Sequence, residues 1–369
     1  MIRILTIMLL SGLPAALNAT NDTIGLRLPE PVGLEHNRIN VGVIPQVELI
    51  SIVQTISKYP ETFAFLMAKD SSAYAGDVAR HFGSYSDHPA VRMLDRLSLR
   101  PGMLNFSAPS NIMLMADESL RLRADIEADE FVIRRAGGID SLKVLLDLLR
   151  DFAGKSSFNE FFAEHKEFYL SLAEQTVRSM GPDNYIAELE NFYGRSQRSY
   201  NIVLVSLYGP VGFGNSLLHS DQKREIYNTL GPRSVKGGSP LFGDGEYLRH
   251  MIRHEFSHPF INPLTEKYWD TVKACSAGYE AIPEVARKNV CGDWQECINE
   301  FIIRAITTYL AFGDSEEAGA RAYDREAGRG VSCLDDLLKN IRLYESDRDS
   351  FPTFESFYPK ILDVFRNIQ

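Results

Sequence analysis

The run His254-Glu255-Phe256-Ser257-His258 contains residue types that can bind a metal ion and activate a water molecule. On a helix, at about 100° per residue, two histidines four positions apart project within about 40° of each other. Their imidazoles can therefore bind one zinc ion. Glu255 falls beside that face, where its carboxylate can hydrogen-bond a water on the metal and act as general base. The spacing predicts both a metal site and a base.

A catalytic zinc ion needs a third protein ligand and one position left open for water. Residues 294–306 read as a second amphipathic helix, and it carries two candidate carboxylates. Glu296 and Glu300 are four residues apart on a mainly apolar helix, where a buried carboxylate requires a partner. We favour Glu300 because it sits deeper in the apolar run, and Glu296 is the second choice.

An ordinary ion pair is the competing explanation for Glu300. Arg304 follows it by one helical turn, which is the spacing at which such pairs form. Both contacts can exist together, with Arg304 supporting the ligand from behind. His250 precedes His254 by one turn, but three histidines on one straight helix do not converge on a tetrahedral site, so we interpret His250 as structural. The isolated histidines are interpreted as surface or core residues: His81, His88 and His219.

Residues 1–19 have the composition of a secretory signal peptide. Arg3 precedes an almost wholly apolar run from Ile4 to Leu17, and small residues lie near an expected cleavage point after Ala19. The run is shorter than the about 20 residues that a membrane-spanning helix needs. We therefore expect a secreted or periplasmic protein with no stable membrane insertion after cleavage.

The four cysteines all lie near the end of the chain. An even number in an exported chain favours two disulfides, with three pairings open. A cysteine-bound zinc site is disfavoured because no two of them have the Cys-x-x-Cys spacing. They are Cys275, Cys291, Cys297 and Cys333.

The composition is that of a globular protein and argues against one class of partner. The 369 residues are 44% hydrophobic and 24% charged, with a formal net charge of -10. Binding to phosphate backbones depends on clustered lysine and arginine, which this chain lacks. We expect no nucleic-acid partner.

The elements that must position these residues are mainly helices in the first half. Residues 20–38 are polar and read as an extended lead-in, so the packed protein is expected to begin near Ile39. Residues 39–199 form a predicted helical region, because apolar residues recur at helical spacing over 47–57, 139–152 and 158–180.

The pattern changes at Tyr200, where a predicted catalytic region over residues 200–369 begins. β-Branched runs predict strands over 202–205 and 224–230, and a glycine-rich loop over 233–245 leads to the histidine-bearing helix. The strand over 200–208 is a candidate sheet edge for binding an extended peptide. The expected fold class is α+β, mainly helical.

These motifs together resemble the DUF4932 family of bacterial domains, whose members resemble gluzincin-type zinc metallopeptidases. The resemblance covers nearly all of the chain after the signal peptide, and His254–His258 is its specific part. The other stretches that carry it are residues 259–263, 296–306, 43–49 and 344–359.

The resemblance implies a zincin-like catalytic region with a small sheet packed on the His-Glu-x-x-His helix. His254, His258 and a later glutamate would be zinc ligands, with Glu255 as catalytic base. Thermolysin-like gluzincins often have Asp four residues after the ligand glutamate, where this chain has Arg304. Leu264 occupies the place of the third histidine of metzincins, which excludes that pattern.

The expected function is an exported zinc-dependent hydrolase, in particular a metallopeptidase acting on peptides or proteins. Zinc would polarise the scissile carbonyl, and Glu255 would pass a proton from water to the leaving amine. Tyr323 is a candidate for stabilising the oxyanion. Two alternatives remain open: an inactive exported binding protein that retains the fold, and a hydrolase of a non-peptide amide.

Overall fold

The computed structural model describes residues 25–68, 72–100 and 103–366, so the predicted signal peptide lies outside the described residues. The chain divides into two units. Unit 1 comprises the residues up to Asp183 together with Arg198–Leu248, and unit 2 comprises Asn184–Gln197 together with the residues from Arg249 onwards. The chain therefore enters unit 2, returns to unit 1, and enters unit 2 again.

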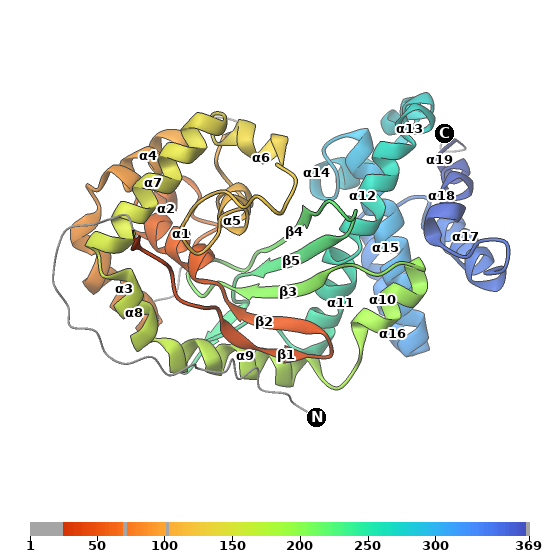
Figure 1. Ribbon diagram of the computed structural model, residues 1–369. Coiled ribbons are helices and arrows are strands. Elements are labelled where there is room, and N and C mark those ends of the chain that lie inside the picture. The colour runs from red at the N-terminus through yellow and green to blue at the C-terminus, as the bar shows by residue number, and fades with distance from the viewer. Residues whose placement is uncertain (1–24, 69–71, 101–102, 367–369) are drawn as a thin grey trace. The chain divides into compact units, whose positions relative to one another are not determined.

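A mixed five-stranded sheet is the centre of unit 1, with strand order β1-β2-β3-β5-β4 (Figure 1). The pairs β2–β3 and β3–β5 are parallel, whereas β1–β2 and β4–β5 are antiparallel. The strands are β1 (Val32–His36), β2 (Ile39–Val43), β3 (Ser199–Leu204), β4 (Gly212–Leu218) and β5 (Arg224–Leu230).

The packed protein begins earlier than the expected Ile39, because β1, within the expected extended lead-in, belongs to the sheet. Asn37 and Arg38 both have left-handed backbone angles, with φ of 47° and 69°. That two-residue turn folds β1 back along β2, as in a tight hairpin. Because β2 then pairs with β3, the start of the chain shares a sheet with residues from 199 onwards. The observed division into units consequently differs from the predicted boundary between residues 199 and 200.

Two further expectations about the strands are also wrong. β3 lies between β2 and β5, so it is an internal strand and not a sheet edge. Residues 233–245 are not all loop, since β6 (Ser234–Lys236) and β7 (Ser239–Leu241) form a hairpin. Its two-residue turn is Gly237-Gly238, where φ is 59° and 83°, a backbone that glycine adopts readily.

Helices of unit 1 confirm the predicted periodic segments at α1 and α7, whereas the segment 158–180 is interrupted at His165. α9 packs against β1 and β2. The helices are α1 (Pro45–Thr55), α2 (Tyr59–Thr62), α3 (Ala73–Phe82), α4 (Pro89–Ser98), α5 (Ala108–Leu114), α6 (Glu130–Arg135), α7 (Ile139–Lys155), α8 (Phe158–Glu164) and α9 (Lys166–Met180), with the 3₁₀ turn η2 (Gly83–Tyr85).

Unit 2 is helical, and α15 is its central element, with nearly every residue from Cys297 to Thr308 buried. α12, α16 and α17 pack against α15. The stacked rings of Tyr193 and Phe260, with centroids 4.3 Å apart, join α10 to α12. The helices are α10 (Tyr185–Tyr193), α12 (His258–Lys267), α13 (Trp269–Ala274), α14 (Glu284–Asn289), α15 (Trp294–Asp314), α16 (Glu316–Gly328), α17 (Leu334–Ser346), α18 (Phe354–Ile361) and α19 (Asp363–Arg366), with the 3₁₀ turn η3 (Ser276–Ala281); α11 (Gly245–Glu255) crosses the unit boundary.

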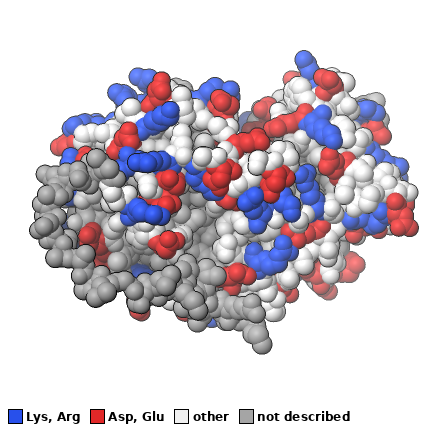
Figure 2. All heavy atoms as spheres, viewed as in Figure 1, with Lys and Arg blue, Asp and Glu red and all other residues white. Residues whose placement is uncertain are grey.

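The prediction of an α+β, mainly helical protein is confirmed. Within the described ranges, none of the helices is long and apolar enough to cross a membrane. On the face seen in Figure 2, acidic and basic side chains are interspersed.

The cysteine prediction is half right, because one disulfide joins Cys291 to Cys297 and the other two cysteines of the described chain are free thiols. Cys275 Sγ instead donates to the backbone carbonyl oxygen of Val272 at 3.3 Å. Cys333 is buried at the start of α17, where burial raises the pKa of its thiol to about 12.

A buried carboxyl in α1 makes the stability of unit 1 depend on pH. Glu48 is 1% exposed, and burial raises its pKa to about 7, although Tyr74 donates a hydrogen bond to it at 2.5 Å. In the unfolded chain this carboxyl has its ordinary pKa of 4.5, so between about pH 4.5 and 7 the folded state binds more protons. Stability therefore falls as pH rises through that window.

We predict that Glu48→Gln removes this loss, which amounts to about 3 kcal/mol at most. The variant should match the wild type in thermal stability near pH 4.5 and exceed it at pH 8, as measured by calorimetry. Parallel pH profiles for the two proteins would contradict the prediction.

Candidate metal centre

The two candidate histidines lie on either side of a helix break. We expected one helix through His258, but α11 ends at Glu255 and α12 begins at His258. Pro259 accounts for the difference, because it cannot donate to the carbonyl of residue 255 and its ring clashes with that group. Ser257 Oγ donates to the carbonyl of Arg253 at 2.5 Å within the break. The chain turns but keeps both imidazoles directed to the same place.

The start of α15 is fixed by local contacts, and these decide between the two candidate glutamates. Asp293 caps the helix by accepting from the backbone N–H of Glu296 at 2.9 Å. The exposed Glu296 side chain turns back, and its Oε2 accepts from the N–H of Gly292 at 2.7 Å. Glu300, one turn further along, faces the histidines. The structure therefore brings Glu300, and not Glu296, to the site.

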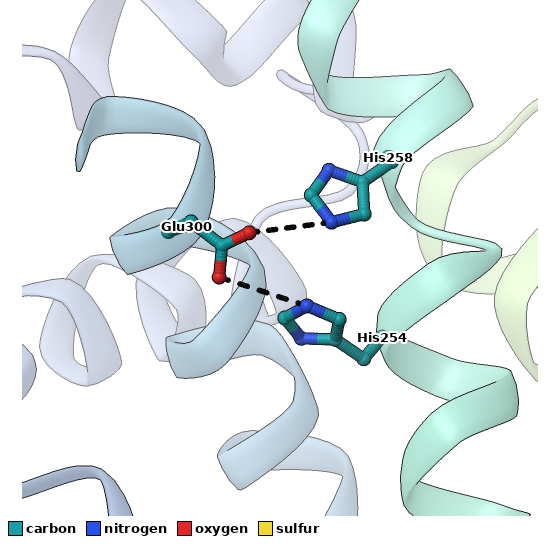
Figure 3. A group of neighbouring side chains, drawn as sticks. All are labelled: His254, His258 and Glu300. Atoms are coloured by element: carbon teal, nitrogen blue, oxygen red, sulfur yellow. Dashed lines mark ion pairs between the residues drawn. The ribbon is translucent and has the colours of Figure 1, made fainter. Parts of the chain in front are cut away.

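The three side chains converge as Figure 3 shows. Glu300 Oε2 lies 3.6 Å from His254 Nε2, and Glu300 Oε1 lies 3.4 Å from His258 Nε2. One atom from each residue falls within 4.8 Å of the others. The three residues are therefore close enough to hold a metal ion.

Burial lowers the pKa of one of the candidate ligands. The pKa of His254 is held well below its usual range, first by burial and then by the neighbouring His258 and Arg304. Its imidazole is therefore neutral at pH 7, as a metal ligand must be. Among the described residues, neither His254 Nδ1 nor Glu300 Oε2 finds a hydrogen-bond partner, although both atoms are buried.

Arg304 confirms the expected ion pair with Glu300, and it does so alongside the cluster. Its Nη2 lies 2.7 Å from Glu300 Oε2, without the alignment of a hydrogen bond. Its Nη1 donates to Glu326 Oε2 at 2.7 Å. Burial opposes the charge on Arg304, but the two glutamates together hold its pKa above the usual value. Sequence reasoning missed Glu326, because nothing in its spacing links α16 to α15.

His250 is not one of the three converging residues, and its ring forms a hydrogen bond with an arginine side chain. Its Nδ1 accepts from Arg325 Nη2 at 3.1 Å. Burial and the neighbouring Arg325 charge lower its pKa to about 3. The ring is therefore neutral.

The two candidate catalytic residues, Glu255 and Tyr323, lie outside the three-residue cluster. Glu255 is the last residue of α11, half-buried, and follows the ligand candidate His254 directly. It is not one of the three converging residues, as expected for a base. Tyr323 donates its hydroxyl to Asp335 at 2.9 Å, so that group is already engaged.

Another cluster, which lies in unit 1, also consists of residue types that can bind a metal ion, but its contacts do not suit one. Asp125, His219 and Glu225 each offer an atom within 4.8 Å of the others. Arg123, however, donates to both carboxylates at 2.7–3.1 Å, and His219 Nε2 lies 2.9 Å from Glu225 Oε1. A guanidinium already supplies the positive charge there, so we interpret the group as an ion-pair network.

The fold and the cluster thus define an α+β protein with a His-His-Glu site that can hold a metal ion. The chain belongs to the family described as a domain of unknown function, DUF4932, whose model matches residues 39–364. This confirms the family resemblance noted from the sequence. No curated protein and no solved structure matches the chain.

We predict that the purified protein binds about one metal ion per chain and that His258→Ala and Glu300→Ala each abolish this. Elemental mass spectrometry after resupply of zinc provides the measurement. Glu296→Ala is the matched control, because that carboxylate bonds to Gly292 and should leave the metal content unchanged. Loss of metal in Glu296→Ala with retention in Glu300→Ala would reverse the ligand assignment.

Proposed function

We propose that this protein is an exported zinc-dependent hydrolase, and specifically a metallopeptidase of the gluzincin type with a zincin-like catalytic region. The observation that carries the proposal is the convergence of His254, His258 and Glu300. Glu255, the candidate base, follows His254 directly in the chain. Two imidazoles and one carboxylate are a ligand set used by catalytic zinc sites that keep a position open for water.

The donor atoms favour a transition metal, because nitrogen ligands disfavour magnesium and calcium, which prefer oxygen. Zinc is chosen because the two histidines flank Glu255 in the order His-Glu-x-x-His, in which zinc hydrolases combine two ligands with a general base. Bound by these residues, zinc would act as a Lewis acid that polarises a carbonyl group and lowers the pKa of a water molecule. His254 is neutral and buried, so it can offer a lone pair without first losing a proton.

Glu255 has the role of general base in this proposal. A carboxylate beside the ligand face accepts a proton from the attacking water and transfers it to the leaving amine. Its place at the end of α11, half-buried and next to His254, leaves it outside the three ligands. The disulfide between Cys291 and Cys297 supports export, since such bonds persist in oxidising compartments.

We predict that Glu255→Gln keeps its zinc but lowers kcat/KM for peptide hydrolysis by at least about 100-fold, the contribution typical of a general base. Zinc content is measured by elemental mass spectrometry, and cleavage is followed on a quenched fluorescent peptide library and on a denatured protein. Glu296→Gln serves as the isosteric control and should remain active.

The outcome separates the proposal from its alternatives. A wild type that binds zinc but cleaves neither peptides nor simple non-peptide amides would favour an inactive binding protein. Cleavage confined to non-peptide amides, and abolished in Glu255→Gln, would retain the zinc chemistry and replace the substrate class.

A further inference from the structure

Arg304 bridges two carboxylates, and this arrangement has a consequence for the metal site. One arm of its guanidinium lies against Glu300 and the other donates to Glu326, both at 2.7 Å. The Arg304 side chain is 8% exposed and that of Glu326 is 0% exposed. The bridge is therefore held inside unit 2, where α15 and α16 pack together.

The two oxygens of Glu300 have different neighbours. Oε1 faces His258 Nε2 at 3.4 Å, whereas Oε2 lies 2.7 Å from Arg304 and 3.6 Å from His254 Nε2. A guanidinium against one oxygen leaves the other to be shared with a metal ion. The guanidinium also fixes the orientation of the Glu300 carboxylate, which could otherwise rotate about the bond that joins it to the rest of the side chain.

We propose that Arg304 and Glu326 are a positioning pair: they orient Glu300 so that it presents Oε1 to the metal, and thereby set the metal affinity of the site. This inference rests on the proposed function, in which Glu300 is a zinc ligand. Arg304 touches neither histidine in this scheme and acts through Glu300.

Glu326 is needed to balance charge, because the positive guanidinium of Arg304 on its own would repel a divalent metal ion bound nearby. Glu326 accepts from Arg304 at 2.7 Å and from Arg325 at 2.8 Å. Its carboxylate, which Arg325 and Arg329 also approach, offsets part of the charge of Arg304 and anchors the arm that points away from the site. Without that anchor, Arg304 would be free to turn both arms to Glu300 and compete with the metal for its oxygens.

The geometry requires arginine and not merely a positive charge. A guanidinium is a rigid fork that can contact two carboxylates at once, whereas a lysine ammonium is a point charge on a flexible stem. Lysine at this position retains the charge but loses the bridge. Charge and orientation can thus be tested separately.

We expect Arg304→Lys to weaken zinc binding by about 10- to 100-fold, the range found when a group supporting a metal ligand is removed. Zinc affinity is measured by competition with a chromophoric chelator, without any assay of turnover. The d–d absorption spectrum of the cobalt(II)-loaded protein should also change, because the coordination of Glu300 is altered. An unchanged affinity and spectrum would overturn the proposal.

Arg123→Lys is the matched control, because Arg123 also bridges two carboxylates, Asp125 and Glu225, and contacts none of the three ligands. It should leave the zinc affinity unchanged. Calorimetry of each metal-free variant shows whether it is folded, and Arg304→Gln is measured alongside in case the buried lysine unfolds unit 2. Arg304→Gln that binds zinc as tightly as the wild type, or more tightly, would overturn the positioning role.

A double-mutant cycle tests the pairing itself. Glu326→Gln should weaken zinc binding about tenfold in the wild type and have little effect in the Arg304→Gln background, because its influence passes through Arg304. Equal effects in both backgrounds would exclude the pair. A wild type that binds no zinc would overturn this inference together with the proposed function, whereas zinc binding that is insensitive to both residues would overturn the inference alone.

Discussion

The contacts of one largely buried carboxylate, that of Glu300 with a side chain 16% exposed, constrain the helices of unit 2. The imidazoles of His254 and His258 approach it from one side and the guanidinium of Arg304 approaches from the other. A buried carboxylate surrounded by donors and cations is stable only while those groups stay in place. The helices α11, α12, α15 and α16 must therefore hold fixed positions relative to one another, and the dense packing of α15 provides that rigidity.

Pro259 is a second constraint, because it divides the His-Glu-x-x-His segment into the end of one helix and the start of another. Spacing alone would place both imidazoles on one straight face. The break changes the direction of the backbone after Glu255, yet the two rings still reach Glu300. The result is that each histidine is carried by its own helix, and the packing of both helices in unit 2 determines whether the ligands converge.

Sequence patterns predicted the features that depend on local spacing. His254, His258 and Glu300 were identified because helical periodicity relates residues within one segment, and the Arg304 pair was foreseen for the same reason. The choice between Glu296 and Glu300 needed the cap at Asp293, which consumes the first turn of α15. Glu326 was missed because a contact between helices leaves no spacing signal. β4 was missed because Gly212 and Gly214 lack β propensity, and β1 because its pairing depends on a left-handed turn.

The course of the chain through the two units bears on how the protein could be divided. Unit 2 takes α10 from the middle of the sequence and its remaining helices from the end, while unit 1 takes β1 and β2 from the beginning and β3 to β5 from beyond α10. A fragment starting at residue 200 would lack Tyr193, which stacks on Phe260. It would also lack β2, the strand that pairs with β3 on the side away from β5. Neither unit is therefore a transferable module that could be gained, lost or exchanged in evolution by a single cut.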